Sequence, residues 1–157
     1  MKKTGKALLA MALLSVTVLG GVASAATISK TTWPSVKAGS SGGFVSALQA
    51  DLWSSGYQNT VGTVDGSFGS GTTSAVKSFQ TAEGLTSDGV VGNGTWSKLD
   101  NYMVYNTANS RFYRNSGSTT YQTYYLMLAD GSRTILNYFL EYRSNRNTVK
   151  SGTVFSE

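Results

Sequence analysis

The sequence predicts an α+β protein in which a small three-helix bundle is followed by a small antiparallel β module. Three observations predict this fold: helical spacing of apolar residues in the first half, an internal repeat there, and strand-like alternation in the second half. Aromatic usage changes between the halves, since residues 101–157 hold eight of the nine tyrosines and none of the three tryptophans. We therefore expect a helical domain at 33–101 and a tyrosine-rich β module at 102–157.

The first residues have the pattern of a secretory signal peptide. Three lysines lie in residues 2–6, residues 7–19 are apolar or small apart from one serine and one threonine, and Ala23-Ser24-Ala25 fits a cleavage site. The apolar run is shorter than the roughly 20 residues of a membrane span. We expect residues 1–25 to be removed, leaving a secreted protein without a stable membrane anchor.

Composition excludes several classes of chemistry. The chain contains no cysteine and no histidine, which rules out a disulfide, a Cys-His or Ser-His-Asp catalytic group and a zinc site built on histidine. Without residues 1–25, ten cations and eight anions remain, a formal charge of +2. This weak positive charge does not indicate a nucleic-acid partner. Nothing in the sequence calls for a cofactor.

The helical domain is expected to contain three helices. Val45, Leu48 and Leu52 lie on one face of a predicted helix at 43–54, which Gly56 would end. A second helix is predicted from Ser70 to about Gly84, and a third at 95–102. The segment at 45–49 recurs 31 residues later at 76–80, and the Asp-Gly turn at 64–69 recurs 23 residues later at 87–92. The second copy therefore has a connection that is eight residues shorter.

These elements, in this order, closely resemble the peptidoglycan-binding domains of the PG_binding_1 type over residues 33–99. The matching elements are Val36-Lys37-x-Gly39, Gly42, Val45-x-x-Leu48-Gln49-x-x-Leu52, Gly56-Tyr57, Val64-Asp65-Gly66-x-Phe68-Gly69, Thr72, Ala75-Val76-Lys77-x-Phe79-Gln80, Gly84-Leu85, Asp88-Gly89-Val90-Val91-Gly92 and Thr95-Trp96-x-x-Leu99. The resemblance implies a cell-wall-binding module, which is usually a targeting appendage on peptidoglycan enzymes. Together with the signal peptide, it implies a bacterial source and a location that is extracellular or associated with the cell wall. Peptidoglycan or its muropeptides are accordingly the expected partner.

The apolar residues and glycines of these motifs are best interpreted as core and turn positions. A ligand groove is expected beside the turns, because muropeptides present sugar faces, amides and carboxylates that suit aromatic and neutral hydrogen-bonding groups. The candidate ligand-binding residues are Tyr57, Ser67, Thr72, Asn93 and Thr95. Trp53 and Trp96 are further candidates for stacking on sugar, although Trp96 fits the core better.

The second half reads as four or five antiparallel strands. Residues 121–128 and 134–143 alternate in the manner of strands, with an Asp-Gly hairpin signal at 129–132 between them. Residues 102–107 and 111–114 would pair across 108–110, and 147–156 would add a further strand. The tyrosines either fill a thin core or form a surface for glycan, protein or anionic wall polymer. In that second interpretation the charge would come from Arg111, Arg114, Arg143 and Arg146.

Catalysis is not expected. Glycosidases need two carboxylates that flank one bond, and the β module offers only Asp130, Glu141 and the near-terminal Glu157. The sequence therefore favours a secreted, non-catalytic wall-binding protein whose β module binds wall or a partner. The alternative is a wall-targeted secreted effector, such as a toxin, an inhibitor or a small cell-wall hydrolase, with its activity in the β module.

Overall fold

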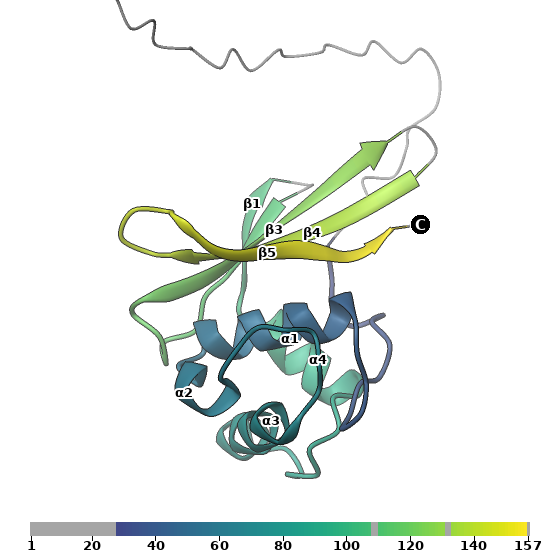
Figure 1. Ribbon diagram of the computed structural model, residues 1–157, viewed down its shortest axis with the longest axis vertical. Coiled ribbons are helices and arrows are strands. Elements are labelled where there is room, and N and C mark those ends of the chain that lie inside the picture. The colour runs from purple at the N-terminus through teal and green to yellow at the C-terminus, as the bar shows by residue number, and fades with distance from the viewer. Residues whose placement is uncertain (1–27, 108–109, 131–132, 157) are drawn as a thin grey trace, which may run out of the picture.

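The computed structural model describes residues 28–107, 110–130 and 133–156 (Figure 1). The predicted signal peptide at 1–25 lies outside these residues. So do residues 108–109 and 131–132, which belong to two of the predicted turns. The described chain is an α+β structure, with helices first and an antiparallel sheet after them.

The helical part contains α1 (Gly43–Ser54), α2 (Gln58–Val61), α3 (Ser70–Ala82) and α4 (Asn93–Asp100). Helix α1 has the predicted bounds, whereas α4 begins and ends two residues earlier than expected. The prediction of three helices did not include α2, a single turn that follows Tyr57. This turn lies in the connection of the first repeat copy, which is eight residues longer than that of the second. The additional residues form a helical turn, in which the Val61 side chain is buried.

The sheet contains β1 (Met103–Thr107), β2 (Ser110–Tyr113), β3 (Tyr121–Asp130), β4 (Arg133–Tyr142) and β5 (Thr148–Ser156). Its order is β1-β2-β3-β4-β5, and every neighbouring pair is antiparallel. Tyr125 faces Tyr138 across the central pair, and both side chains are buried. Alternation along β3 and β4 therefore directs one row of side chains toward the helices and the other row away from them.

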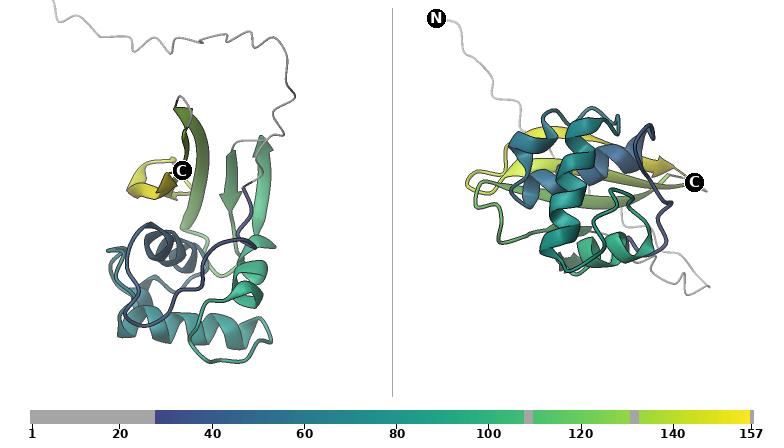
Figure 2. Two further views of the ribbon diagram at one scale, coloured as in Figure 1. Left: turned by 90° about the vertical axis from the view of Figure 1, so that its right-hand side faces the viewer. Right: turned by 90° about the horizontal axis from the view of Figure 1, so that it is seen from below.

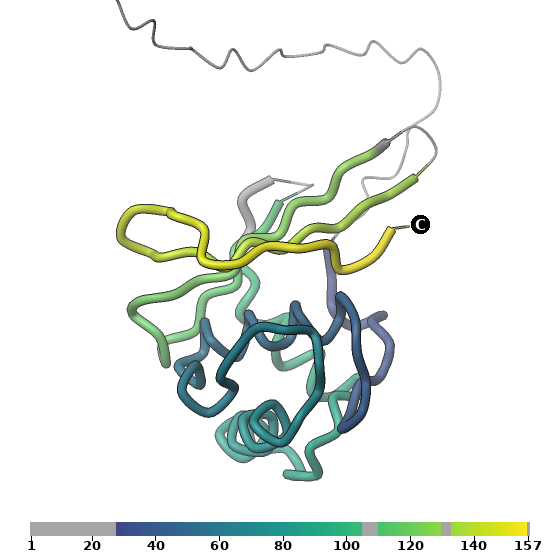
Figure 3. The backbone as a smooth tube through the Cα atoms, viewed as in Figure 1, coloured from purple at the N-terminus to yellow at the C-terminus, as the bar shows by residue number. Residues whose placement is uncertain are grey.

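Helix α1 is the element that joins the two parts. The sheet stands on one side of α1, and α3 lies on the opposite side, as two perpendicular views show (Figures 1 and 2). Gly43 makes this approach possible at the first turn, since a Cβ there would lie 2.3 Å from the carbonyl oxygens of Thr153 and Val154 in β5. Figure 3 traces β5 across α1, with the β4–β5 loop and the C-terminal end at opposite sides of the molecule.

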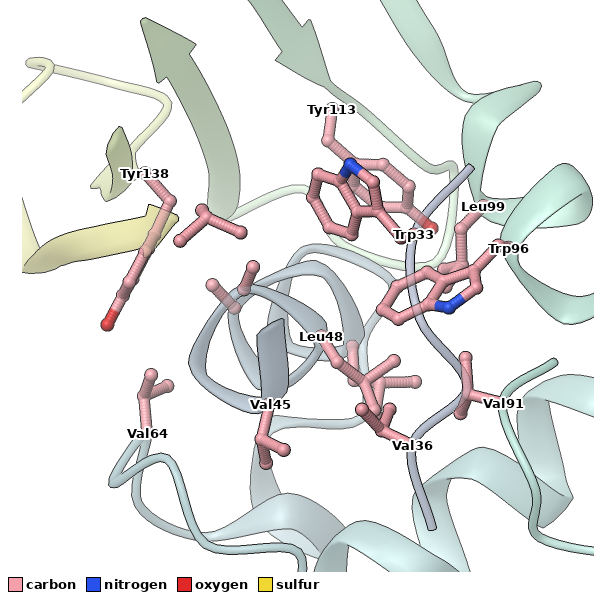
Figure 4. Close-up of a cluster of buried hydrophobic side chains, with 14 of the residues drawn as sticks. Trp33, Val36, Val45, Leu48, Val64, Val91, Trp96, Leu99, Tyr113 and Tyr138 are labelled. Carbon is pink, nitrogen blue, oxygen red and sulfur yellow. The ribbon is translucent and has the colours of Figure 1, made fainter. Parts of the chain in front are cut away.

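One continuous core spans the helices and the sheet. Figure 4 shows Trp33, Trp96 and Tyr113 on one side of α1 and Tyr138 on the other. Trp96 is fully buried, as expected, and its indole nitrogen donates to the carbonyl oxygen of Pro34 at 2.9 Å. The Trp33 and Trp96 rings meet edge to face at 5.0 Å. The two predicted modules therefore bury their apolar surfaces against each other.

The segment just after the predicted cleavage site enters this core. Ile28 is buried, and the Lys30 ammonium forms an ion pair with the Asp51 carboxylate of α1 at 3.1 Å, with both side chains 0% exposed. The same ammonium lies 3.8 Å from the centre of the Tyr125 ring, whose hydroxyl donates to Asp51 at 2.9 Å. Burial raises the pKa of Asp51 and lowers that of Lys30. The ion pair and the Tyr125 hydroxyl act against these pKa shifts, but burial has the larger effect on both groups.

Candidate functional site

The first repeat copy is organised around the side-chain amide of Gln49. Its oxygen accepts hydrogen bonds from the backbone N–H groups of Asp65 and Gly66, at 3.0 and 2.8 Å. Its nitrogen donates to the Asp65 carboxylate, the Ser67 carbonyl and the Thr72 hydroxyl, at 2.9, 3.0 and 3.1 Å. One buried amide thus fixes the Asp-Gly turn and ties it to the start of α3.

The second copy repeats this arrangement around Gln80. Its oxygen accepts from the N–H group of Gly89 at 2.9 Å. Its nitrogen donates to the Asp88 carboxylate, the Val90 carbonyl and the Thr95 hydroxyl, at 2.9, 2.9 and 3.1 Å. Gly66 and Gly89 have nearly the same positive φ, 77° and 78°, which favours glycine at both turns. The internal repeat is therefore a repeat of one hydrogen-bonded cage, to which we refer as the glutamine cage.

The cages also set the charge state of their aspartates. The pKa of Asp65 is lowered mainly by the hydrogen bond from Gln49, and that of Asp88 mainly by the backbone N–H of Val90. Each carboxylate accepts a bond from the N–H group two residues on, at 2.8 Å in both copies. These bonds favour the charged form, so both turns carry a stable negative charge.

The structure gives the five candidate ligand residues different surroundings. Thr72 and Thr95 are 2% and 5% exposed, and their hydroxyls accept the cage bonds. Ser67 and Asn93 have exposed side chains beside the two turns, and Tyr57 is half-buried at the start of α2. Ligand contact stays a prediction for all five residues. A ligand that contacts Thr72 or Thr95 would have to do so through the small part of each side chain that remains exposed.

A hollow of about 320 Å³ opens between the helices and the sheet. We name it the interdomain cleft; it is lined by Trp53, Gly62, Thr63, Val64, Leu140, Val149 and Lys150. A second hollow of about 270 Å³ lies beside the Gln80 cage. We name that one the cage hollow; Gly92 and Gly94, on either side of Asn93 in sequence, and Thr95 are among its lining residues. Both hollows are surfaces on which a ligand can be accepted.

Comparison with known families identifies the helical part. Residues 41–99 match the family described as "Putative peptidoglycan binding domain". The helical part of the chain is a domain of this family. The expectation drawn from the sequence resemblance is thereby confirmed. Both glutamine cages lie within the matched residues.

Two curated proteins are each similar to this chain over 71 residues. One, from Kitasatospora aureofaciens, is described as "Uncharacterized protein in bpoA1 3'region" and is 46% identical over 71 residues, or 45% of this chain and 58% of that protein. The other is the zinc D-Ala-D-Ala carboxypeptidase of Streptomyces albus G, 41% identical over 71 residues, or 43% of this chain and 27% of the carboxypeptidase. The chain thus spans little more than half of one relative and about a quarter of the other.

The sheet face that points away from the peptidoglycan-binding domain carries an aromatic row. The rings of Phe112, Tyr124 and Phe139 follow one another across β2, β3 and β4, with centroids 5.0 and 5.8 Å apart. The Arg146 guanidinium lies 4.1 Å above the Phe112 ring and pairs with Glu141 at 2.8 Å. We name this surface the outer aromatic row. It joins aromatic planes to a stacked cation, which is chemistry suited to glycans and to anionic partners.

The arginines proposed for such a surface take separate positions. Arg146 and Arg114 both lie over the Phe112 ring of the outer aromatic row, at 4.1 and 5.3 Å. Arg143 instead donates to the backbone carbonyls of Tyr121, at the start of β3, and of Asn115, in the β2–β3 connection, each at 2.9 Å. Its role in the structure is to fix the chain that connects β2 to β3.

Sequence reasoning missed three features of these sites. Gln49 and Gln80 occupy the same position in the two repeat copies, which is a signal that they share a role. The sequence pattern did not show that this role is to form hydrogen bonds with the Asp-Gly turns. Lys30 and Asp51 gave no signal, because a lone lysine after a signal peptide and an acid within a helix are both typical of surfaces. Lys150 gave none either, since only the packing of β5 against the helices brings it to the cleft.

Proposed function

We propose that the chain is a secreted, non-catalytic peptidoglycan-binding protein in which the sheet adds a second contact surface. The observation that carries the proposal is the family match of residues 41–99. In this chain two glutamine cages shape the turns of the matched domain, and each turn adjoins a hollow or an exposed polar side chain. Secretion is supported by the signal-peptide pattern of residues 1–25.

The non-catalytic part of the proposal is supported by how the acidic side chains are used. Six of the eight acidic residues have described side chains, and each of the six has a hydrogen-bonding or ionic partner within the fold: Asp51, Asp65, Glu83, Asp88, Asp100 and Glu141. A glycosidase acid and base must instead face an open space across a glycosidic bond. The described residues contain no group of three or more acids, histidines or cysteines able to hold a metal ion.

The β module enters the proposal as a wall-binding or partner-binding surface. Its outer aromatic row is not covered by the helices, which pack on the opposite face of the sheet (Figure 2). Sugar rings stack on aromatic planes, and the arginines above Phe112 add attraction for anionic groups.

Within the described part of the chain, no helix has the length and apolar character needed to cross a membrane.

The direct test is co-sedimentation of the mature chain, residues 26–157, with purified peptidoglycan sacculi. The whole mature chain is the right material because helices and sheet share one core, so neither half is expected to fold by itself. We expect the protein to pellet with sacculi and to release no soluble muropeptides. Protein that stays in the supernatant would contradict wall binding, and released muropeptides would establish a hydrolase instead.

A further inference from the structure

We infer that the interdomain cleft is the site that binds a peptidoglycan segment, with Trp53 as the platform for a sugar ring and Lys150 as the partner of a carboxylate on the attached substituent. This inference deepens the proposed function and rests on it. The site is composite, because Trp53, Gly62, Thr63 and Val64 come from the peptidoglycan-binding domain while Leu140, Val149 and Lys150 come from β4 and β5. The β module then has a defined role, which is to complete the site.

Trp53 is held in place before any ligand arrives. Its indole N–H donates to the carbonyl oxygen of Gly62 at 2.9 Å, and its ring meets Tyr121 edge to face at 5.2 Å. Trp33 and Trp96 are buried, whereas Trp53 keeps part of its surface exposed and lines the cleft. A fixed aromatic plane binds a sugar face without a large loss of side-chain freedom.

The floor and walls of the cleft suit the less polar face of a carbohydrate. Val64 and Leu140 are buried, and Val149 is 37% exposed, so the cleft offers apolar surface to a ligand. Gly62 has a φ of 76°, and a Cβ at this position would meet no atom within 4 Å. Residue 62 therefore borders open space, and beside it the exposed Thr63 can meet hydroxyl or amide groups of a ligand.

Lys150 supplies the charge. It lies on β5 opposite Leu140, is exposed, and forms no ion pair with a side chain among the described residues. The charge of Lys150 contributes to the lowered pKa of Asp65, but it is the smallest of the causes, and the hydrogen bond from Gln49 is the largest. Because Asp65 is already bonded by Gln49 and by the N–H of Ser67, the ammonium remains available to a ligand carboxylate.

Size and charge together select the occupant. A volume of about 320 Å³ is at the lower end of small-ligand pockets, which suits one or two sugar rings rather than a folded protein segment. An apolar wall with a single cation at its rim matches a neutral ring that carries one anionic substituent. Peptidoglycan combines these two features in its stem-bearing sugars, whereas a chitin-type oligosaccharide has the rings without the carboxylate.

The test compares two soluble probes by titration calorimetry and tryptophan fluorescence on the mature chain. The probes are a disaccharide-peptide released from sacculi, which carries carboxylates, and N,N'-diacetylchitobiose, which carries none. Lys150→Met should weaken binding of the disaccharide-peptide about tenfold and leave chitobiose binding unchanged. The matched control is Lys37→Met, which removes an equally exposed lysine that does not line the cleft and should change neither affinity. Trp53→Leu should weaken both probes, and the fluorescence response to them should vanish with it.

The outcomes separate this inference from the proposed function. If the wild-type chain binds sacculi and Lys150→Met binds the disaccharide-peptide as tightly as wild type, the cleft assignment is wrong and wall binding stands. Equal losses for Lys150→Met and Lys37→Met would also overturn the assignment, because net charge alone would explain them. If the wild-type chain does not pellet with sacculi, the proposed function fails and the cleft assignment fails with it. Thermal unfolding of each variant checks that it has folded.

Discussion

Helix α1 has two buried faces of different character. The face toward the bundle carries Val45, Leu48 and Leu52, with Gln49 as its one polar group. The face toward the sheet adds polar contacts to its apolar ones: the Ala47 carbonyl accepts from Tyr125, and Ser54 shares a hydrogen bond of 2.8 Å with Thr123. The first face is stabilised mainly by apolar burial, whereas the second also depends on matched polar partners, each of which is costly to leave alone.

This difference predicts where the molecule is fragile. Apolar side chains tolerate small changes because their neighbours can shift to fill space, but a buried charge without its partner has no such relief. The sheet face of α1 should therefore be the more sensitive of the two to single substitutions. The first two predictions test that face, and the last two test the cages on the bundle face.

The largest effect is expected for Asp51→Ala. The substitution leaves the fully buried Lys30 ammonium without its ion-pair partner and the Tyr125 hydroxyl without its acceptor. We expect a loss of about 3–5 kcal/mol in the free energy of unfolding, measured by urea denaturation of the mature chain. The double variant Lys30→Met with Asp51→Leu removes both charges and should recover most of that loss. A double variant as unstable as the single one would show that the ion pair is not the cause.

A smaller loss is expected for Gly43→Ala. The added methyl group would lie 2.3 Å from the carbonyl oxygens of Thr153 and Val154, so β5 must move away from α1. We expect destabilisation of about 1–3 kcal/mol by the same denaturation assay. Gly94→Ala is the matched control, since a Cβ there meets no atom within 4 Å and the position is helical. The control should be neutral or slightly stabilising, by up to about 1 kcal/mol. Similar losses for both variants would mean that the close approach to β5 is not responsible.

On the bundle face, Gln49→Glu tests the first cage and Gln80→Glu tests the second. A carboxylate cannot donate the three hydrogen bonds that each amide nitrogen makes, and it places a second negative charge beside Asp65 or Asp88. Each variant should lose roughly 1–3 kcal/mol of unfolding free energy. The two losses should be similar, because the amide nitrogen has matching acceptors in both copies. A loss confined to one copy would show that the two cages share their geometry but do not contribute equally to the free energy of unfolding.

The smallest effect is a pH dependence that comes from the two cage aspartates. Their pKa values are lowered in the folded state, so the unfolded state binds more protons at acidic pH. The stability they contribute is present above the unfolded value of about 3.9 and is lost as pH falls through the lower folded values. The variant Asp65→Asn with Asp88→Asn should therefore show a shallower loss of stability than wild type between about pH 5 and pH 2. Thermal unfolding across that range provides the comparison, and identical slopes would remove the cages as the origin.

Much of the fold could be predicted because its signals are local. The bounds of α1 follow from apolar spacing and from Gly56, which has a φ of 91° after the helix. The five-stranded antiparallel sheet follows from alternation and turn residues. The extra helix α2 was missed because a single turn of four residues has no periodicity to detect. Among the predicted ligand residues, Thr72 and Thr95 were expected at the surface. The sequence does not indicate that their hydroxyls accept hydrogen bonds from the buried amides of Gln49 and Gln80.

By itself, the sequence determined the α+β class, the repeated Asp-Gly turns and the family of the helical domain, since these depend on residues close together along the chain. Only the tertiary structure decided what lies on the second face of α1, where Lys30 finds Asp51 across 21 positions of sequence. It also decided that Lys150 reaches the cleft beside Trp53. The physical reason is the same in both cases. Charged side chains have no periodic signature of burial, and their role is fixed by the groups that folding brings to them.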